Sequence, residues 1–416
     1  MIPIAGIIAA FFLVIYLLSQ NKSLAAAMFA GSVVVGLSRS TDWSQNFKEF
    51  FPTVYQGLKD PVTIELVVLV ALVTIFAYLM KEMSLLNELI NIARYYVNNL
   101  YLTISIIPSI IGMLPIPGGA ILSAPIIAPV GKKLKMSGAR LTSINIFYRH
   151  LWYFSFPYLP SLIIAASLSG INIYTIALMN LPIVILMLVI GWIYYTRTDN
   201  NRQKIKDSPK ENVKEEEIKK PAGVRIVTVL LPFVLVLVPP IIFSIEFTTS
   251  LLLGIAFVII VKRNEFKVNM ILEGFNQELV LGVLGIMIFR TFIENSEGVY
   301  NITDILIEAG IPLLVLALVI PFLVGLLTGN HTGAIGISYP ILLSLFQGSN
   351  FYSLWHMVIF SSSYFGYMLS PFHLCNLLTV EYFKTTLPKY YKDILYPFVT
   401  TMVGIVVLSL IYYNFL

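Results

Sequence analysis

Charged residues are scarce in this sequence. Only 12% of its 416 residues are Asp, Glu, Lys or Arg, whereas 57% are hydrophobic. A soluble domain carries about 25% charged residues, so this chain lacks the polar surface that water requires. The composition therefore predicts an all-helical polytopic membrane protein with no sizeable soluble domain. The net charge of +5 does not indicate nucleic acid as a partner, because the basic residues lie in loops beside apolar runs.

Cysteine and intramembrane carboxylates are also rare. Cys375 is the single cysteine, which excludes an intrachain disulfide and argues against a metal site built on cysteine. Glu65 and Glu278 stand at the starts of apolar runs rather than at their centres. Paired acids, His-Glu-x-x-His, Gly-x-Gly-Asp and a phosphate-binding loop are all missing, so we expect neither an intramembrane enzyme nor an ATP-driven pump. No cofactor is expected, although a separate ATPase or binding-protein partner stays open.

The apolar runs fall into two similar halves, residues 1–195 and 226–416, joined by the charged linker 196–225. Each half is expected to hold five transmembrane helices, one of them broken, and one re-entrant helical hairpin. We expect the first run to remain as an uncleaved helix, since no positive segment precedes it. The expected spans are Ile2 to Leu18, Ser23 to Leu37, Val62 to Met80, Tyr174 to Tyr195, Ile226 to Phe243, Phe247 to Val261, Leu279 to Ile293 and Ile394 to Phe415. Arg39 to Asp60 is expected to be an amphipathic connector along the membrane interface.

Two polar, glycine-rich breaks identify the hairpins. Pro115 to Ala120 interrupts the hairpin at about 100–130, and Thr328 to Gly333 interrupts the hairpin at about 311–346. Irregular backbone at bilayer depth is tolerated only where it is buried in protein or lines a cavity, so both breaks are candidate binding sites. Broken helices are expected at 141–168 and 351–379, interrupted at 154–160 and 368–376. Ile-Pro and Gly recur before the two hairpin breaks at a constant offset of 213 residues, which indicates two repeats.

The basic residues predict how the chain is oriented. Each half has an odd number of crossings, so the halves must be inverted relative to each other. Placing the linker in the cytoplasm of a plasma (inner) membrane puts most basic loop residues there, as the positive-inside rule requires. Both termini are then outside, the first hairpin enters from the cytoplasm, and the second enters from outside. The cytoplasmic set is Lys22, Lys81, Arg94, Lys132, Lys133, Lys135, Arg140, Lys262, Arg263, Lys267, Lys384, Lys389 and Lys392, against Arg39, Lys48 and Lys59 outside, with Arg290 near that side.

This order of spans, with paired hairpins and proline-broken helices after them, resembles the ion transporter superfamily of divalent-anion, citrate, gluconate and arsenite transporters. The chain is most similar to the gluconate-permease-like branch, and we expect a distinct integral membrane family within the superfamily. Its hairpin tips are Pro117-Gly118-Gly119 and Asn330-His331-Thr332, unlike the Ser-Asn-Thr tips of the dicarboxylate branch. The resemblance implies a homodimer with elevator-like motion that moves a small organic anion, such as gluconate, citrate or a dicarboxylate, with Na⁺ or H⁺.

The hairpin tips and broken helices supply the candidate site residues. Glycine-rich backbone can present amides to an anion at half-helix N-termini and carbonyls to sodium at C-termini. The alternative is that these glycines only allow close helix packing. The substrate set is Pro117, Gly118, Gly119, Ser123, Arg149, His150, Asn330, His331, Thr332, Ser370 and Asn376. A sodium site is expected near Gly118, Ser155, Thr328, Gly329, Asn330 and Ser370.

The sequence leaves open the role of Arg149 and the identity of the coupling ion. Arg149 either contacts the substrate or snorkels to the cytoplasmic surface as a structural anchor. Proton-coupled carriers usually hold a carboxylate inside the membrane, and its lack favours sodium, or a proton carried by histidine. All four histidines, His150, His331, His356 and His373, fall in the hairpin and broken-helix regions. A cation/proton antiporter on the same scaffold is therefore the second functional hypothesis.

Overall fold

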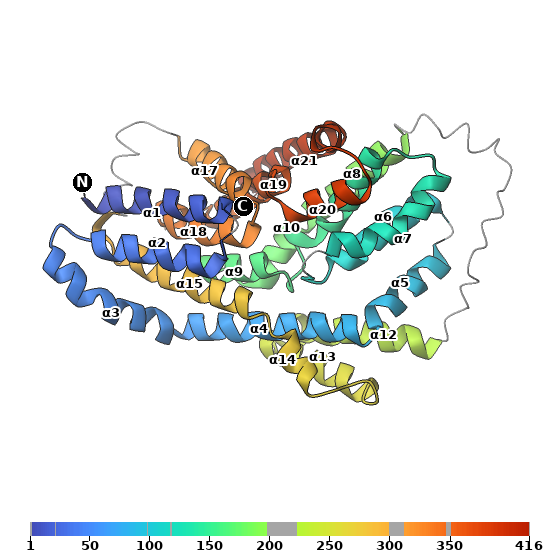
Figure 1. Cartoon of the computed structure of the whole chain (residues 1–416), viewed down its shortest axis with the longest axis horizontal. Coiled ribbons are helices and arrows are strands. Elements are labelled where there is room, and N and C mark those ends of the chain that lie inside the picture. The colour runs from blue at the N-terminus through green and yellow to red at the C-terminus, as the bar shows by residue number, and fades with distance from the viewer. Residues whose placement is uncertain are drawn as a thin grey trace.

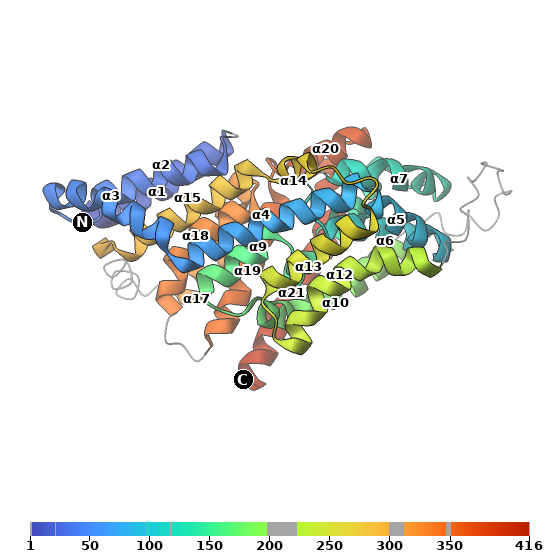
Figure 2. The ribbon, with the colours of Figure 1, turned by 90° about the horizontal axis from the view of Figure 1, so that it is seen from below.

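The computed structural model describes residues 2–20, 22–97, 99–116, 119–197, 223–298, 312–346 and 351–415, and these residues are helical apart from short connections. Figures 1 and 2 show an elongated molecule, and in Figure 1 α3 (Trp43–Lys59) and α4 (Pro61–Glu82) follow one another along its lower side. Among these described residues, five helices are long and apolar enough to cross a membrane: Ile2–Ser19, Pro61–Glu82, Ile173–Arg197, Arg225–Phe243 and Leu387–Tyr412. The chain is thus an all-helical, multi-span membrane protein, as the composition predicts.

The first half follows the expected order of elements closely. Local signals set several boundaries: Ser23 caps α2, Asp42 caps α3, and Pro61 begins α4 where its missing N–H costs nothing. The helices are α1 (Ile2–Ser19), α2 (Leu24–Ser38), α3 (Trp43–Lys59), α4 (Pro61–Glu82), α5 (Leu85–Tyr96), α6 (Leu100–Gly112), α7 (Gly119–Lys133), α8 (Gly138–Arg149), the 3-10 turn η1 (Leu151–Phe154), α9 (Pro160–Ser169) and α10 (Ile173–Arg197).

The described helices after the linker follow a similar order. They are α12 (Gly223–Phe243), α13 (Phe247–Val261), α14 (Asn269–Gly274), α15 (Gln277–Glu294), α17 (Leu313–Thr328), α18 (His331–Phe346), α19 (Tyr352–Leu369), α20 (Leu374–Tyr382) and α21 (Leu387–Phe415). Most of the linker, 198–222, and residues 299–311 lie outside the described residues.

The four hairpin arms are too short to cross a bilayer upright. α6, α7, α17 and α18 have 13, 15, 16 and 16 residues. At a rise of ~1.5 Å per residue they reach ~20 to 24 Å, less than the ~30 Å of hydrocarbon. Their contacts also indicate hairpins, because α6 packs on α7 and α17 packs on α18.

The breaks are placed differently from the sequence expectation in two respects. The first broken helix leaves α-helical geometry at His150, before the expected 154–160, and resumes at Pro160. The second hairpin tip is narrower than Thr328 to Gly333, because Thr328 ends α17 and His331 already begins α18. The second broken helix is interrupted over 370–373, inside the expected 368–376.

Helix contacts occur in matching pairs between the halves. α1 packs on α2 as α12 packs on α13, and α3 packs on α15 as α14 packs on α4. In the same way α6 packs on α8 and α17 on α19, and α7 packs on α20 and α18 on α9. The last two pairs cross between the halves: the second arm of each hairpin touches the second part of the opposite broken helix. The broken helices and hairpin tips are therefore brought together at the junction of the halves.

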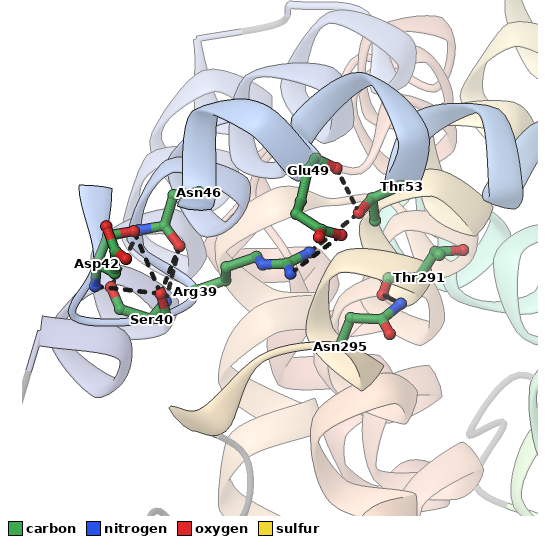
Figure 3. A network of polar contacts seen from close by, with 8 residues as sticks. All are labelled: Arg39, Ser40, Asp42, Asn46, Glu49, Thr53, Thr291 and Asn295. Carbon is green, nitrogen blue, oxygen red and sulfur yellow. Dashed lines mark hydrogen bonds and ion pairs between the residues drawn. The ribbon is translucent and has the colours of Figure 1, made fainter. Parts of the chain in front are cut away.

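The connector α3 is amphipathic, as expected. One face carries exposed aromatic side chains, Trp43, Phe47, Phe51 and Tyr55. At its start, Asn46 donates to the carbonyls of Leu37 and Ser40, while its own side-chain oxygen accepts from Ser40 (Figure 3). The Arg39 guanidinium donates to Thr53 Oγ1 at 3.1 Å, and the Arg39 carbonyl accepts from Glu297 N at 3.2 Å. These contacts fix the connector against α2 and the end of α15.

Candidate functional site

The first broken helix buries a guanidinium where it stops being helical. Arg149 is the last residue of α8 and is only 4% exposed. Its Nη2 donates to the carbonyl of Ile116, at the first hairpin tip, over 3.0 Å. Because the side chain turns inward to that carbonyl, snorkelling to the surface does not describe it. Structural anchoring through Ile116 and contact with a ligand both remain consistent with this placement.

A tertiary contact accompanies the end of α8, and Pro157 keeps the chain from resuming an α-helix directly afterwards. Pro157 lacks the N–H that would donate to Tyr153, and its ring clashes with a continuing helix. Gly112 of α6 lies against the Arg149 backbone so closely that a Cβ on Gly112 would lie 1.9 Å from the Arg149 carbonyl oxygen. The hairpin and the broken helix therefore approach through a position that only glycine can occupy.

The first hairpin presents the start of α7 to Arg149. A Cβ on Gly119, the first residue of α7, would lie 2.3 Å from Arg149 Nη2. Asn145 holds the same helix start, since its Nδ2 donates to the carbonyl of Ala120 at 3.0 Å. The predicted residue Ser123 is fully buried and bonds back to the carbonyl of Ala120 at 3.2 Å. Pro117 and Gly118 lie outside the described residues.

The second broken helix meets Arg149 from the other half. Arg149 Nη1 lies 3.7 Å from the sulfur of Cys375, the second residue of α20, and 3.4 Å from His150 Nε2. The ring of His373, the N-cap residue of α20, lies 4.9 Å from the His150 ring, centroid to centroid. Both ring nitrogens of His373 are buried and lack a hydrogen-bond partner among the described residues. Residues from both halves thus converge on one guanidinium.

Tyr367 links these groups to the second hairpin. Its ring centroid lies 4.0 Å from His373, 5.7 Å from His331 and 5.9 Å from His150. His331, the first residue of α18, also bonds through Nε2 to Ser363 Oγ at 3.1 Å. Tyr153 packs beside both His331 and Tyr367. Three of the four histidines are therefore grouped around one buried tyrosine, and the fourth, His356, bonds to Tyr339 instead.

Several predicted oxygen ligands are occupied within their own segments. The side chain of Asn330 accepts from Gly333 N at 2.9 Å and caps α18, while Thr328 Oγ1 bonds to the carbonyl of Val324. Ser370 Oγ accepts from Phe372 N. Asn376 donates to the carbonyls of Met368 and Ser370 and accepts from Tyr390, so it bridges the break.

Gly329 and the remaining predicted positions have simpler surroundings. Gly329 has φ +62°, and a Cβ there would lie 2.7 Å from the Phe372 backbone, so glycine lets the second tip touch the second break. Ser155 and Thr332 are half-buried. Four described residues near Arg149 were not in the predicted set. They are Tyr153, Tyr367, His373 and Cys375. The clustering of histidine in broken segments was the sequence signal for His373, and it did not point to the other three.

The C-terminus of α8 gives Arg149 partial negative charge nearby, but acidic side chains in the described part of the chain do not balance the guanidinium. Within the described ranges, no Asp or Glu is buried, and no carboxylate lies within 4.0 Å of the Arg149 guanidinium. By contrast, Arg140 pairs with Asp393 at 2.9 Å, and Arg290 pairs with Glu294 at 2.7 Å. The N-termini of α7 and α20, which carry partial positive charge, also face this region. A buried cation beside two helix N-termini is costly unless an anion neutralises it.

Two hollows in the described part of the chain lie away from Arg149. One hollow of about 240 Å³ is lined by Leu102, Ser105, Ile106, Ser109, Tyr148, Leu188 and Trp192, and another of about 530 Å³ lies between Tyr55, Asp60 and Arg290. Neither includes Arg149. Trp152 Nε1 donates to Ser109 Oγ at 2.8 Å, so the indole stands between α6 and the η1 turn that follows Arg149.

The fold and this arrangement define a multi-span membrane protein with a transporter-like fold. The crystal structure of the YdaH transporter from Alcanivorax borkumensis, described as having an unusual topology, superposes with a TM-score of 0.69 and 12% sequence identity, covering 97% of this chain and 98% of that one. At that identity the likeness concerns the fold alone. The chain belongs to the family described as "Protein of unknown function (DUF401)", which matches residues 5–412. No curated protein matches the chain in sequence.

Proposed function

We propose that this protein is a secondary active transporter that moves a small organic anion, a carboxylate, together with Na⁺ or H⁺. The observation that carries the proposal is Arg149, a buried guanidinium with no carboxylate partner in the described part of the chain. A guanidinium binds a carboxylate through two parallel N–H donors, a match of geometry as well as charge. The bound anion would supply the negative charge beside Arg149 that no described carboxylate of the protein supplies.

The neighbours of Arg149 suit the same ligand. The Arg149 Nε has no hydrogen-bond partner among the described residues, so a donor is free in addition to those facing Ile116 and Cys375. The free amides at the start of α7 and α20 add donors that favour negative charge. His373 and Tyr367 can donate to further oxygens of the anion. Gluconate, citrate and dicarboxylates all belong to this chemical class.

The matching helix contacts support two inverted repeats, residues 1–195 and 226–416, on either side of the linker 196–225. In this proposal the hairpins (α6 with α7, α17 with α18) and the broken helices (α8 with α9, α19 with α20) move together against the remaining spans. The motion is elevator-like, the protein is a homodimer in the plasma membrane, and both termini face outside. Arg149 lies where the moving elements of the two repeats meet, which is where a site open alternately to each side is required.

The tip of the second hairpin, between α17 and α18, offers oxygen ligands for sodium as the coupling ion. Carbonyls at the C-terminus of α17, around Thr328 and Gly329, are the oxygen type that sodium prefers. The side chains of Thr328, Asn330 and Ser370 are already bonded locally, so backbone oxygens are the better candidates for a sodium ligand set.

Uptake by proteoliposomes tests the proposal. The purified chain is reconstituted, and labelled gluconate, citrate and succinate are offered with an imposed sodium gradient, an imposed proton gradient or neither. We expect one anion class to accumulate under one gradient and to stop when an ionophore collapses it. Cation exchange without flux of any anion would overturn the proposal.

A cation/proton antiporter is the second candidate, and the grouping of His150, His331 and His373 around Tyr367 favours it. Histidines are the titratable groups available inside the described spans, since no carboxylate is buried there. Replacing His331 by Ala should then abolish pH-dependent cation exchange, with His356→Ala as the matched buried control. Exchange that is unaffected by His331→Ala would count against the histidine route.

A further inference from the structure

His150, His373 and Cys375 place three metal-binding side chains together at the junction of the two broken helices. All three residues are buried, and one donor atom from each lies within 4.8 Å of the others. The set combines two imidazoles with one thiol, which is the chemistry that Zn²⁺ and related borderline or soft ions select. The single cysteine argues against a metal site built on cysteine. Here two histidines complete the set of ligands.

The two histidines are poised differently, and both suit a ligand role. The Nδ1 of His150 lies 2.8 Å from the carbonyl of Ile146, so this nitrogen carries the proton and Nε2 presents its lone pair to the cluster. Metal-bound histidines are held in this way by a hydrogen bond on the opposite nitrogen. His373 is 1% exposed, yet neither ring nitrogen has a partner in the described part of the chain. A buried imidazole without a partner is costly, and a bound ion would satisfy it.

We infer that His150 Nε2, a ring nitrogen of His373 and the Cys375 sulfur form a site for a transition-metal ion of the Zn²⁺ type. Tetrahedral binding at ~2.1 Å to nitrogen and ~2.3 Å to sulfur needs donors about 3.3 to 3.6 Å apart. The present separations reach 4.8 Å, so the cluster closes on binding. His373 makes this movement, because no hydrogen bond restrains its ring. Cys375 gives up its thiol proton to solvent as the metal–sulfur bond forms.

Arg149 sets the charge balance of this site. Its Nη1 now lies 3.4 Å from His150 Nε2 and 3.7 Å from the Cys375 sulfur, so it must move aside when a metal binds. The guanidinium stabilises the thiolate but repels the metal ion. Three protein ligands leave the fourth position open, and an anion held by Arg149 is suited to it. The metal site does not depend on the proposed transport function, because its test is binding at equilibrium.

Metal binding by the detergent-purified full chain tests the inference. Zn²⁺ binding is measured by equilibrium dialysis, and Co²⁺ by the visible absorption of a tetrahedral ion together with its thiolate-to-cobalt charge-transfer band. Because Cys375 is the single cysteine, any such charge-transfer band must come from it. We expect one ion per chain, and binding at least tenfold weaker in His373→Ala and Cys375→Ser, with His356→Ala like the unmodified chain.

A fold control keeps the result interpretable. Size-exclusion elution and thermal unfolding without metal must match between the variants, and added Zn²⁺ should raise the unfolding temperature of the unmodified chain and of His356→Ala only. A Met replacement of Arg149 should bind Zn²⁺ more tightly, since repulsion is removed. No binding by the unmodified chain, or equal binding in Cys375→Ser, would overturn the site. Either result would leave anion uptake unaffected, so this failure is distinct from failure of the transporter proposal.

Discussion

At the scale of single residues, the site depends on one cation and on the small residue that makes room for it. Arg149 is buried by the approach of Gly112 and Gly119 on either side of the first hairpin tip. Gly112 contacts the Arg149 backbone, and Gly119 contacts its guanidinium. The close packing of these two glycines positions the charge, and the binding role of the tip glycines stays a prediction.

Replacing Gly119 by Ala should weaken anion binding without unfolding the protein. The added Cβ would lie 2.3 Å from Arg149 Nη2, which is the flexible end of a side chain and can shift. Losing one hydrogen bond to a charged group costs about 1.5 kcal/mol, so the KM for uptake should rise about tenfold. Gly223→Ala is the control, because a Cβ there meets nothing within 4 Å. An unchanged KM in Gly119→Ala would contradict this role.

At the scale of helices, the broken segments are stabilised by side chains that replace lost backbone partners. Asn376 is the clearest case: it is fully buried, donates to the carbonyls of Met368 and Ser370, and accepts from Tyr390 at 3.1 Å. One amide thus closes the break before α20 and ties α20 to α21. The sequence places Asn376 in the candidate site, whereas its contacts indicate a role in holding the break open at a fixed geometry.

Asn376→Ala should lower the thermal unfolding temperature in detergent. It leaves two buried carbonyls without this donor, and each unsatisfied group costs about 1 to 3 kcal/mol. Tyr390→Phe removes one of the same contacts and should have a smaller effect. Asn180→Ala is a matched control, since the Asn180 side chain is buried but makes no hydrogen bond within the described residues. Equal losses in Asn376→Ala and Asn180→Ala would mean that the bridge does not stabilise the break.

The order of elements could be predicted because membrane spans are encoded locally. Apolar runs, caps and prolines placed most helices, and Phe247 to Val261 agrees with α13 at both ends. The first break was expected too late, because the close contact of Gly112 with the Arg149 backbone is a tertiary effect that no local pattern shows. The meeting of Arg149 with Cys375, which are 226 residues apart, could not be predicted for the same reason.

At the scale of the whole molecule, the fold is retained while the sequence is not. A TM-score of 0.69 at 12% identity shows that the two chains share a fold although few of their residues are identical. The side chains at the meeting of the broken helices must therefore be considered on their own chemistry. In this chain they are one unpaired arginine, three histidines and one cysteine.

The predicted orientation is testable with single cysteines in a Cys375→Ala background. Gln45 in α3 and Lys132 in α7 are exposed and belong to opposite sides in the proposed topology. Gln45→Cys should react with a membrane-impermeant maleimide in intact cells, and Lys132→Cys should react only after permeabilisation. The reverse pattern would require the linker 196–225 to lie outside, contrary to the basic residues that surround it.

Uptake by Arg149→Met tests the central claim most directly. The variant is reconstituted beside the unmodified chain and beside Arg290→Met, which removes an arginine that is paired with Glu294 away from the site. Gradient-driven accumulation of the transported carboxylate should fall about 10- to 100-fold in Arg149→Met, the loss expected for one charge-assisted contact of about 1.5 to 3 kcal/mol. Arg290→Met should retain uptake. Accumulation by Arg149→Met at the rate and affinity of the unmodified chain would contradict the account.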